Sequence, residues 1–197
     1  MLALTARNLV PALLACLALP LAAAAAAAAA AEYDIDPTHT YASFAIDHFG
    51  FSTQHGRFNT TQGTLHFDEE TGTGTVDIRI DATSLDTGFD LRDTVLRGSE
   101  WFNVKDHPDI RFRSQRFILS DGRPVAVEGT LTLLGETRPM RLEIMRFKCG
   151  LNLVIRKRGC GADAEGTLRR SDFGMRTGLP FIGDEVRLRI QVEAYPS

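Results

Sequence analysis

Apolar and polar residues alternate along most of this chain. The alternation is plain in the segments 76–81 (VDIRID), 110–113 (IRFR), 140–144 (MRLEI) and 186–192 (VRLRIQV). A period of two places the apolar set on one face of a β-strand. Short links rich in Gly, Asp and Pro, such as 120–124 (SDGRP), separate these segments and favour antiparallel neighbours. The pattern therefore predicts an all-β domain of antiparallel strands, either a sandwich or a closed barrel.

One segment, 86–98 (DTGFDLRDTVLRG), departs from this alternation. Asp86 and Thr87 are candidates for capping the start of a helix, and Gly98 is a candidate for ending it. The segment therefore predicts a single short α-helix inserted between strands. Its apolar residues are Phe89, Leu91, Val95 and Leu96.

Alternation alone does not say whether the apolar face of the sheet points inward or outward. An outer-membrane barrel alternates in the same way, with its apolar residues facing lipid. Three features favour a soluble protein whose apolar residues face inward. They are the inserted helix, strands that look short for a membrane crossing, and a supply of 3 Tyr and 1 Trp that is too small for two aromatic girdles.

The first 31 residues (1–31) have the features of a secretory signal peptide. A basic residue precedes an apolar run, and an alanine tract, 22–31, ends just before the charged Glu32. A retained membrane anchor is the alternative, because 9–31 is long enough to span a bilayer, but alanine is only weakly apolar. Removing 31 of the 197 residues leaves 166, so 32–197 has a size suited to one domain with its own core.

Charge and cysteine content narrow the function classes further. The formal net charge of −3 argues against nucleic-acid binding, which requires a basic face. The predicted mature chain retains two cysteines, Cys149 and Cys160, and an even count in an exported protein predicts a disulfide. Two free buried thiols are the alternative. A metal site is not predicted, because no histidine lies near either cysteine at ligand spacing.

No catalytic or nucleotide-binding motif stands out in the sequence. The Gly-x-Ser-x-Gly elbow of hydrolases and the glycine patterns that hold phosphates are absent. His48 shares the parity of Phe44 and Ile46, so it is expected to point inward at a strand end, where a hydrogen-bonded histidine is commoner than a general base. The unusual feature is the supply of 12 Phe. In a small barrel they either form the core or line an apolar cavity.

The chain resembles the YceI-like proteins along essentially all of the predicted mature domain. Matching stretches include 33–36 (YDID), 48–52 (HFGFS), 84–87 (SLDT), 129–133 (GTLTL) and 170–175 (RSDFGM). The resemblance implies a lipocalin-like antiparallel β-barrel with one helix, located in the periplasm. It also implies a long cavity that takes polyisoprenoids, isoprenoid quinones or fatty amides, with no catalysis and no cofactor.

Two departures from the family pattern bear on the ligand and its surroundings. Phe89 and Val95 stand where the family usually has histidine, which favours a more apolar ligand or entrance. The segment 149–160 (CGLNLVIRKRGC), called the finger below, stands where relatives more often have polar, glycine-rich residues.

We therefore expect a non-enzymatic periplasmic protein that transports or stores one long apolar lipid. His48 and Arg57 are candidates for contact with the lipid head group. The alternatives are a hydrolase or isomerase that uses His48 as general base, and a ligand-free scaffold that binds a protein partner through its sheet edges. The residues expected to surround the lipid tail are Phe44, Ile46, Phe58, Leu65, Phe67, Ile78, Ile80, Phe89, Leu91 and Phe112.

The finger suggests a second kind of partner. Its tip, 151–155 (LNLVI), is largely apolar and is followed by three cations, 156–158 (RKR), while Arg146 and Lys148 lie on the preceding arm. An apolar tip beside five cations is typical of an element that contacts an anionic membrane surface. The alternative, which the surviving alternation favours, is that Leu151, Leu153 and Ile155 continue a strand and pack inward. A homodimer is also compatible with the sequence.

Overall fold

The structure is a computed structural model that describes residues 30–197. The predicted signal peptide lies outside the described residues except for its last two positions. The strands are β1 (Ala31–Ile35), β2 (Tyr41–His48), β3 (Ser52–Phe58), β4 (Thr61–Asp68), β5 (Thr73–Asp81), β6 (Leu85–Asp86), β7 (Asp109–Ser120), β8 (Arg123–Leu133), β9 (Glu136–Asn152), β10 (Lys157–Arg169) and β11 (Ile182–Pro196). The helices are η1 (Ala82–Ser84), α1 (Asp90–Arg97) and η2 (Arg170–Phe173).

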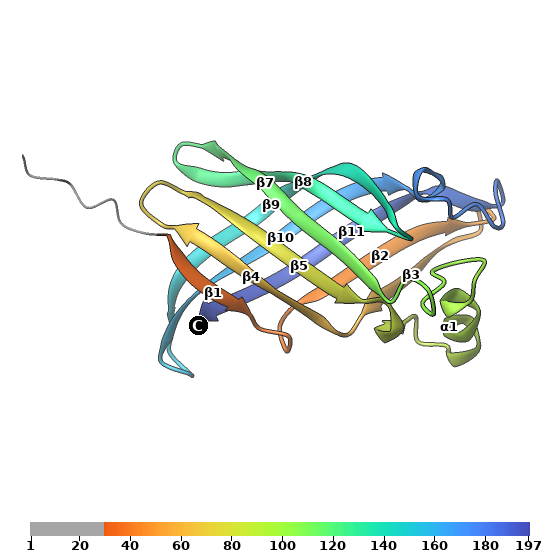
Figure 1. Cartoon of the computed structure of the whole chain (residues 1–197), viewed down its shortest axis with the longest axis horizontal. Helices are drawn as coiled ribbons and strands as arrows, with labels where there is room; N and C mark the ends of the chain where they lie inside the picture. The colour runs from red at the N-terminus through yellow and green to blue at the C-terminus, as the bar shows by residue number, and fades with distance from the viewer. Residues whose placement is uncertain (1–29) are drawn as a thin grey trace, which may run out of the picture.

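Eight of these strands form a closed antiparallel ring in the order β1-β4-β5-β7-β8-β9-β10-β11. The ring closes at β1, where Tyr33 lies opposite Leu65 of β4 on one side and Pro196 of β11 on the other. β2, β3 and β6 extend the sheet from β11 toward the end that carries α1 (Figure 1). The predicted antiparallel barrel with one inserted helix is therefore confirmed, and the sandwich is excluded.

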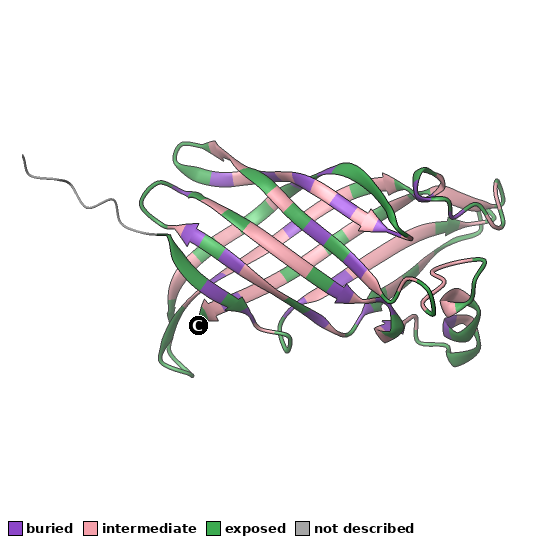
Figure 2. Cartoon of the chain, in the orientation of Figure 1, coloured by how far each residue is buried: buried purple, intermediate pink, exposed green. Residues whose placement is uncertain are grey.

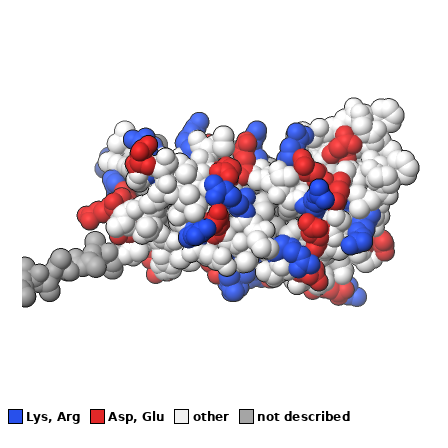
Figure 3. Space-filling model, turned by 90° about the horizontal axis from the view of Figure 1, so that it is seen from above, with Lys and Arg blue, Asp and Glu red and all other residues white. Residues whose placement is uncertain are grey.

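The sequence alternation corresponds to the inside and outside of the barrel. Buried and exposed residues alternate along the strands (Figure 2). Ile80, Phe112 and Leu142 are buried, whereas outward side chains such as Arg111 and Asp77 form an ion pair on the surface. Lys and Arg are interspersed with Asp and Glu over the outer face seen in Figure 3. The barrel is thus apolar inside and charged outside.

Two tight turns explain how consecutive strands become hairpin neighbours. Asp121 and Gly122 connect β7 to β8, and Leu134 and Gly135 connect β8 to β9. All four residues have positive φ angles, between 50° and 78°. Turns of two residues with positive φ match the right-handed twist of the flanking strands, and glycine adopts this conformation without steric cost. The turn residues noted in the sequence therefore act as predicted.

The helix is shorter than predicted and starts differently. α1 begins after Phe89, which makes no side-chain capping hydrogen bond. Asp86 belongs to β6, and the Thr87 backbone N–H donates to the Asp93 carboxylate at 2.9 Å, so the prediction that Asp86 and Thr87 cap the helix is wrong. Gly98 follows the last helical residue, as predicted. No helix in 30–197 has both the length and the apolar content needed to cross a membrane.

The finger also departs from the favoured prediction, since Leu151, Leu153 and Ile155 are exposed rather than packed inward. β10 pairs with β11 only from Cys160 onward, and β9 pairs with β8 only up to Glu143. The end of the hairpin is therefore paired only with itself. Alternation continues in the sequence, but the end of the hairpin extends beyond the neighbouring strands, so its side chains have no barrel interior in which to be buried.

Candidate functional site

A cavity of about 550 Å³ lies inside the barrel and extends along it. It reaches from Phe89 and Val95, beside α1, to Phe147 and Cys160 near the opposite end. Its walls consist mainly of aliphatic and aromatic side chains. The volume falls within the roughly 300–1,000 Å³ typical of ligand pockets. The Phe-rich interior therefore leaves a hollow and does not fill the barrel completely.

The wall is built from the inward residues of the alternating strands. β11 supplies Val186, Leu188 and Ile190, for example. Phe44 of β2 lies opposite Gly56 of β3, and a Cβ atom on Gly56 would lie only 2.4 Å from Phe44 Cζ. The missing side chain of Gly56 is therefore what allows the Phe44 ring to occupy its place in the wall.

The end of the cavity away from α1 is closed by aromatic packing. The ring of Phe67 lies 5.8 Å from that of Phe117 and 5.0 Å from that of Phe147, measured between centroids. Phe67 is fully buried, and Phe117 and Phe147 line the cavity. Edge-on and tilted contacts at these distances are favourable beyond simple burial. These three rings therefore pack across this end of the cavity, and we call this cluster the floor.

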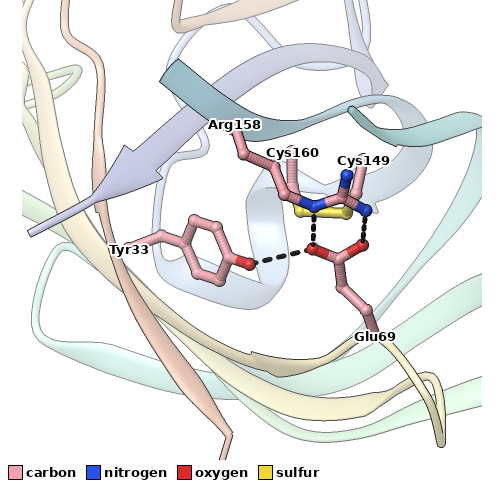
Figure 4. Close-up of a disulfide and its surroundings, with 5 residues drawn as sticks. All are labelled: Tyr33, Glu69, Cys149, Arg158 and Cys160. Atoms are coloured by element: carbon pink, nitrogen blue, oxygen red, sulfur yellow. Dashed lines mark hydrogen bonds and ion pairs between the residues drawn. A yellow bond between two sulfur atoms is a disulfide. The ribbon is translucent and has the colours of Figure 1, made fainter. Parts of the chain in front are cut away.

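The predicted disulfide between Cys149 and Cys160 lies at this closed end and joins β9 to β10 (Figure 4). The two residues are directly opposite each other, with Cα atoms 4.0 Å apart. Arg158 donates two hydrogen bonds to the Glu69 carboxylate, one of them from Nε at 2.9 Å, and the Tyr33 hydroxyl donates a third. The Arg158 guanidinium lowers the pKa of Glu69. These contacts tie the base of the finger to the turn between β4 and β5.

The end beside α1 is open, because several residues that line the cavity there are also exposed to solvent. Phe89, Leu91, Val95 and His55 have both properties. We call this opening the mouth. Three of these four residues, Phe89, Leu91 and Val95, are apolar.

Arg92 brings a positive charge to the mouth. Its guanidinium donates to Gln54 Oε1 at 2.6 Å, to Thr87 Oγ1 at 2.7 Å and to the Thr87 carbonyl at 2.7 Å. These acceptors are all neutral, and no carboxylate in 30–197 forms an ion pair with Arg92. A guanidinium held by neutral groups keeps its attraction for oxygen-bearing or anionic groups.

Thr61 is one of the buried polar residues that line the cavity. It is 1 % exposed and lines the cavity at the start of β4. Within the described residues its Oγ1 is the one buried side-chain oxygen or nitrogen atom without a hydrogen-bond partner. An unpaired buried hydroxyl is unfavourable, and such exceptions call for a specific explanation. The hydroxyl is thus a locally unfavourable feature of the cavity wall.

Arg170 links the helix η2 to the residues that follow it along the chain. It is buried, and it donates to the backbone carbonyls of Gly183 at 2.8 Å, Ile182 at 2.9 Å and Met175 at 3.1 Å. Its guanidinium carbon lies 5.3 Å from the centroid of the Trp101 ring. Burial lowers the pKa of Arg170. The residue is therefore a structural link that also lines the cavity.

The structure brings most of the predicted ligand-contacting residues to one cavity. Phe67 is buried in the floor outside the lining, and Arg57 is exposed on the outer face of β3 with its guanidinium 4.8 Å from the Tyr41 ring. Arg57 therefore lies outside the cavity lining, since its neighbour Phe58 takes the inward position. The predicted residues that do line the cavity are Phe44, Ile46, His48, Phe58, Leu65, Ile78, Ile80, Phe89, Leu91 and Phe112.

Gln54, Thr61 and Arg92 are among the polar residues of the cavity that sequence reasoning missed. Gln54 and its neighbours in β3 (STQHGRF) are polar on both faces, so alternation gave no inward side. Arg92 resembled an ordinary solvated charge of a helix. Thr61 could have been found, because it shares the parity of Leu65 and Phe67.

Two histidines of the described residues, His48 and His55, line the cavity. His48 lines the cavity, its ring lies 4.7 Å from that of Phe49, and no carboxylate in 30–197 hydrogen-bonds to it. Asp36, His39 and Glu193 bring three potential metal ligands together, but none of them lines the cavity. Hydrogen bonding to Asp36 raises the pKa of His39.

Sequence comparison identifies relatives of this chain. A family model described as the YceI-like domain matches residues 33–194. The protein YceI of Escherichia coli O157:H7 is 35% identical over 165 residues, which cover 82% of this chain and 85% of that protein.

Comparison with solved structures agrees with this assignment. The YceI protein of Campylobacter jejuni has a TM-score of 0.67 and 26% identity, covering 77% of this chain and 90% of that one. A polyisoprenoid binding domain from Saccharophagus degradans has a TM-score of 0.63 and 16% identity, covering 85% of this chain and 99% of that one, and shares the fold. The barrel, its inserted helix and the match over 33–194 together show that the chain belongs to the YceI-like domain family.

Proposed function

We propose that this protein binds one long apolar lipid of the polyisoprenoid, isoprenoid quinone or fatty amide type, for transport or storage. The observation that carries the proposal is the apolar cavity, open at the mouth and closed by the Phe67 cluster. Each Å² of apolar ligand surface removed from water contributes roughly 25 cal/mol. A long tail therefore needs few polar contacts. The description of the structurally similar Saccharophagus degradans domain as polyisoprenoid binding supports the same ligand class.

The polar residues suggest how the ligand is oriented. The tail extends from the mouth toward Phe117 and Phe147, and the head group stays near Arg92, Gln54 and the inward-facing His48. Arg92 takes the place that the sequence had assigned to Arg57. The arrangement favours a head group that accepts hydrogen bonds.

A location in the periplasm fits the same picture. The disulfide between Cys149 and Cys160 is of the kind that persists in oxidising compartments, and the signal-like segment 1–31 would direct the chain there.

Binding without catalysis is favoured over the two alternatives. An enzyme that uses His48 as general base would need a group to orient the imidazole, and no carboxylate in 30–197 hydrogen-bonds to it. A ligand-free scaffold would be expected to fill its barrel with side chains. The proposed binding requires no cofactor.

Two measurements test the proposal. Organic extraction of the purified protein, followed by mass spectrometry, should release a long-chain lipid. Ala164→Phe should then lower affinity for a long-chain prenol about tenfold or more, because Ala164 lines the cavity and the new ring would occupy it. Thr167→Phe is the matched control, since Thr167 lies on the same strand but is exposed and outside the lining. Equal affinity of the two folded variants would contradict lipid binding inside the barrel.

A further inference from the structure

The tip of the finger presents apolar side chains to solvent. Leu151 is 60%, Leu153 80%, Val154 89% and Ile155 48% exposed. Figure 1 shows the turn between β9 and β10 at the end of the barrel opposite α1, so this tip takes no part in the mouth. Adjacent exposed apolar residues of this kind mark surfaces that are covered by a partner.

The tip is held in a defined conformation. The Asn152 side-chain oxygen accepts the backbone N–H of Val154 at 3.0 Å and of Ile155 at 3.4 Å. The Asn152 amide donates to the Tyr195 hydroxyl at 2.9 Å. The disulfide and the ion pair between Arg158 and Glu69 secure the base of the hairpin (Figure 4). The apolar side chains therefore stay exposed without an ordering step on binding.

The finger and the part of β9 that leads into it carry only positive charge. The segment 146–159 contains five cations and no acidic residue. Arg158 is paired with Glu69, and Arg146 lies 3.6 Å from Asp163. The cations that form no ion pair within the described residues are Lys148, Arg156 and Lys157.

We propose that the finger docks this protein on an anionic phospholipid bilayer. The four apolar side chains enter the boundary between head groups and acyl chains, while Lys148, Arg156 and Lys157 face the lipid phosphates. The charge complementarity selects an anionic bilayer over a neutral one. Because the finger and the mouth lie at opposite ends of the barrel, docking tethers the protein and leaves the mouth free.

A second apolar region provides an internal contrast. Phe49, Phe51 and Phe181 are exposed, and the rings of Phe49 and Phe181 stack 5.8 Å apart. The segments around them, 47–55 and 177–186, contain no Lys or Arg. A membrane contact through these residues would therefore show little dependence on lipid charge or salt, unlike one through the finger.

Vesicle co-sedimentation of the disulfide-bonded protein tests the proposal. The wild type should bind phosphatidylcholine vesicles that contain phosphatidylglycerol, bind pure phosphatidylcholine at least tenfold more weakly, and lose affinity as salt is raised. Lys157→Gln should weaken binding about fivefold, as expected for one cation at an anionic surface. Lys105→Gln, which changes an exposed lysine outside the finger, should leave binding unchanged.

Substitutions in the two apolar regions locate the docking surface. Val154→Asp should abolish binding to anionic vesicles, whereas Phe51→Asp, at a position that is 90% exposed, should not. Both variants should keep the unfolding midpoint and the cavity affinity of the wild type, so a failure here is distinguishable from a failure of lipid binding. Equal binding to anionic and neutral vesicles, or loss of binding in Phe51→Asp but not in Val154→Asp, would overturn the proposal.

Discussion

Thr61 and Thr40 are equally buried in the cavity wall, but loss of the hydroxyl is expected to change stability in opposite directions at the two positions. Both are 1% exposed and line the cavity. The Thr40 hydroxyl accepts the Glu193 backbone N–H at 3.2 Å, whereas the Thr61 hydroxyl has no partner among the described residues. The cost of an unpaired buried hydroxyl is about 1–3 kcal/mol. The Thr61 hydroxyl is therefore retained at a cost to the ligand-free fold.

Thr61→Val should raise the free energy of unfolding of the lipid-free protein by about 1 kcal/mol, because the unpaired hydroxyl is removed. Thr40→Val should lower the free energy of unfolding, because it leaves the Glu193 N–H unpaired. Denaturant titration followed by Trp101 fluorescence measures both changes. Destabilisation by Thr61→Val would show that its hydroxyl already has a partner in the free protein.

Among the elements, the β9–β10 hairpin is the one whose stability we expect to depend most on the disulfide between Cys149 and Cys160. The residues between Cys149 and Cys160 form strand pairs only within the hairpin, so no backbone pairing with a neighbouring strand holds them. Replacing both cysteines with serine should lower the free energy of unfolding by about 3 kcal/mol or somewhat less. Equilibrium unfolding of this double variant, compared with oxidised and reduced wild type, measures the effect. Reduced wild type should match the variant, and an identical midpoint for all three would contradict the prediction.

Over the whole molecule, ion pairs on the outer face make the free energy of unfolding depend on pH in the acidic range. Arginine hydrogen bonds lower the pKa values of Glu69, Asp77 and Glu128. A carboxyl group with a lowered pKa contributes stability that is complete above its unfolded value, about 4, and is lost as pH falls through the folded value. The free energy of unfolding should therefore decline as pH drops below about 4.

Glu69→Gln isolates one part of this dependence. The variant should be less stable than the wild type at neutral pH, and the difference should shrink as pH falls below about 4, because the wild-type carboxylate becomes protonated. Glu70→Gln is the control, since Glu70 forms no ion pair within the described residues. Urea titrations at several pH values provide the measurement. A difference for Glu69→Gln that stays constant with pH would contradict the assignment.

The sequence by itself determined most of the strands and, for the strands whose residues alternate, the side that faces inward. Alternation is a local property, because successive side chains of a strand point to opposite faces. It therefore placed Phe44, Ile78 and Phe112 correctly on the inner face. The turn at Gly122 was also readable, because its backbone conformation depends on neighbouring residues alone.

Only the tertiary structure decided how far along the barrel each inward residue lies and what it meets there. Phe67 has inward parity but packs into the floor, while Leu151 has the same pattern and extends past the wall into solvent. Arg92 belongs to the site because its helix lies at the mouth, where the side chain contacts Thr87 and Gln54. Closure of the ring between β1 and β11 joins segments from opposite ends of the chain. Such long-range pairings create the cavity, and a local pattern carries no information about the distance between strands that are not neighbours in sequence.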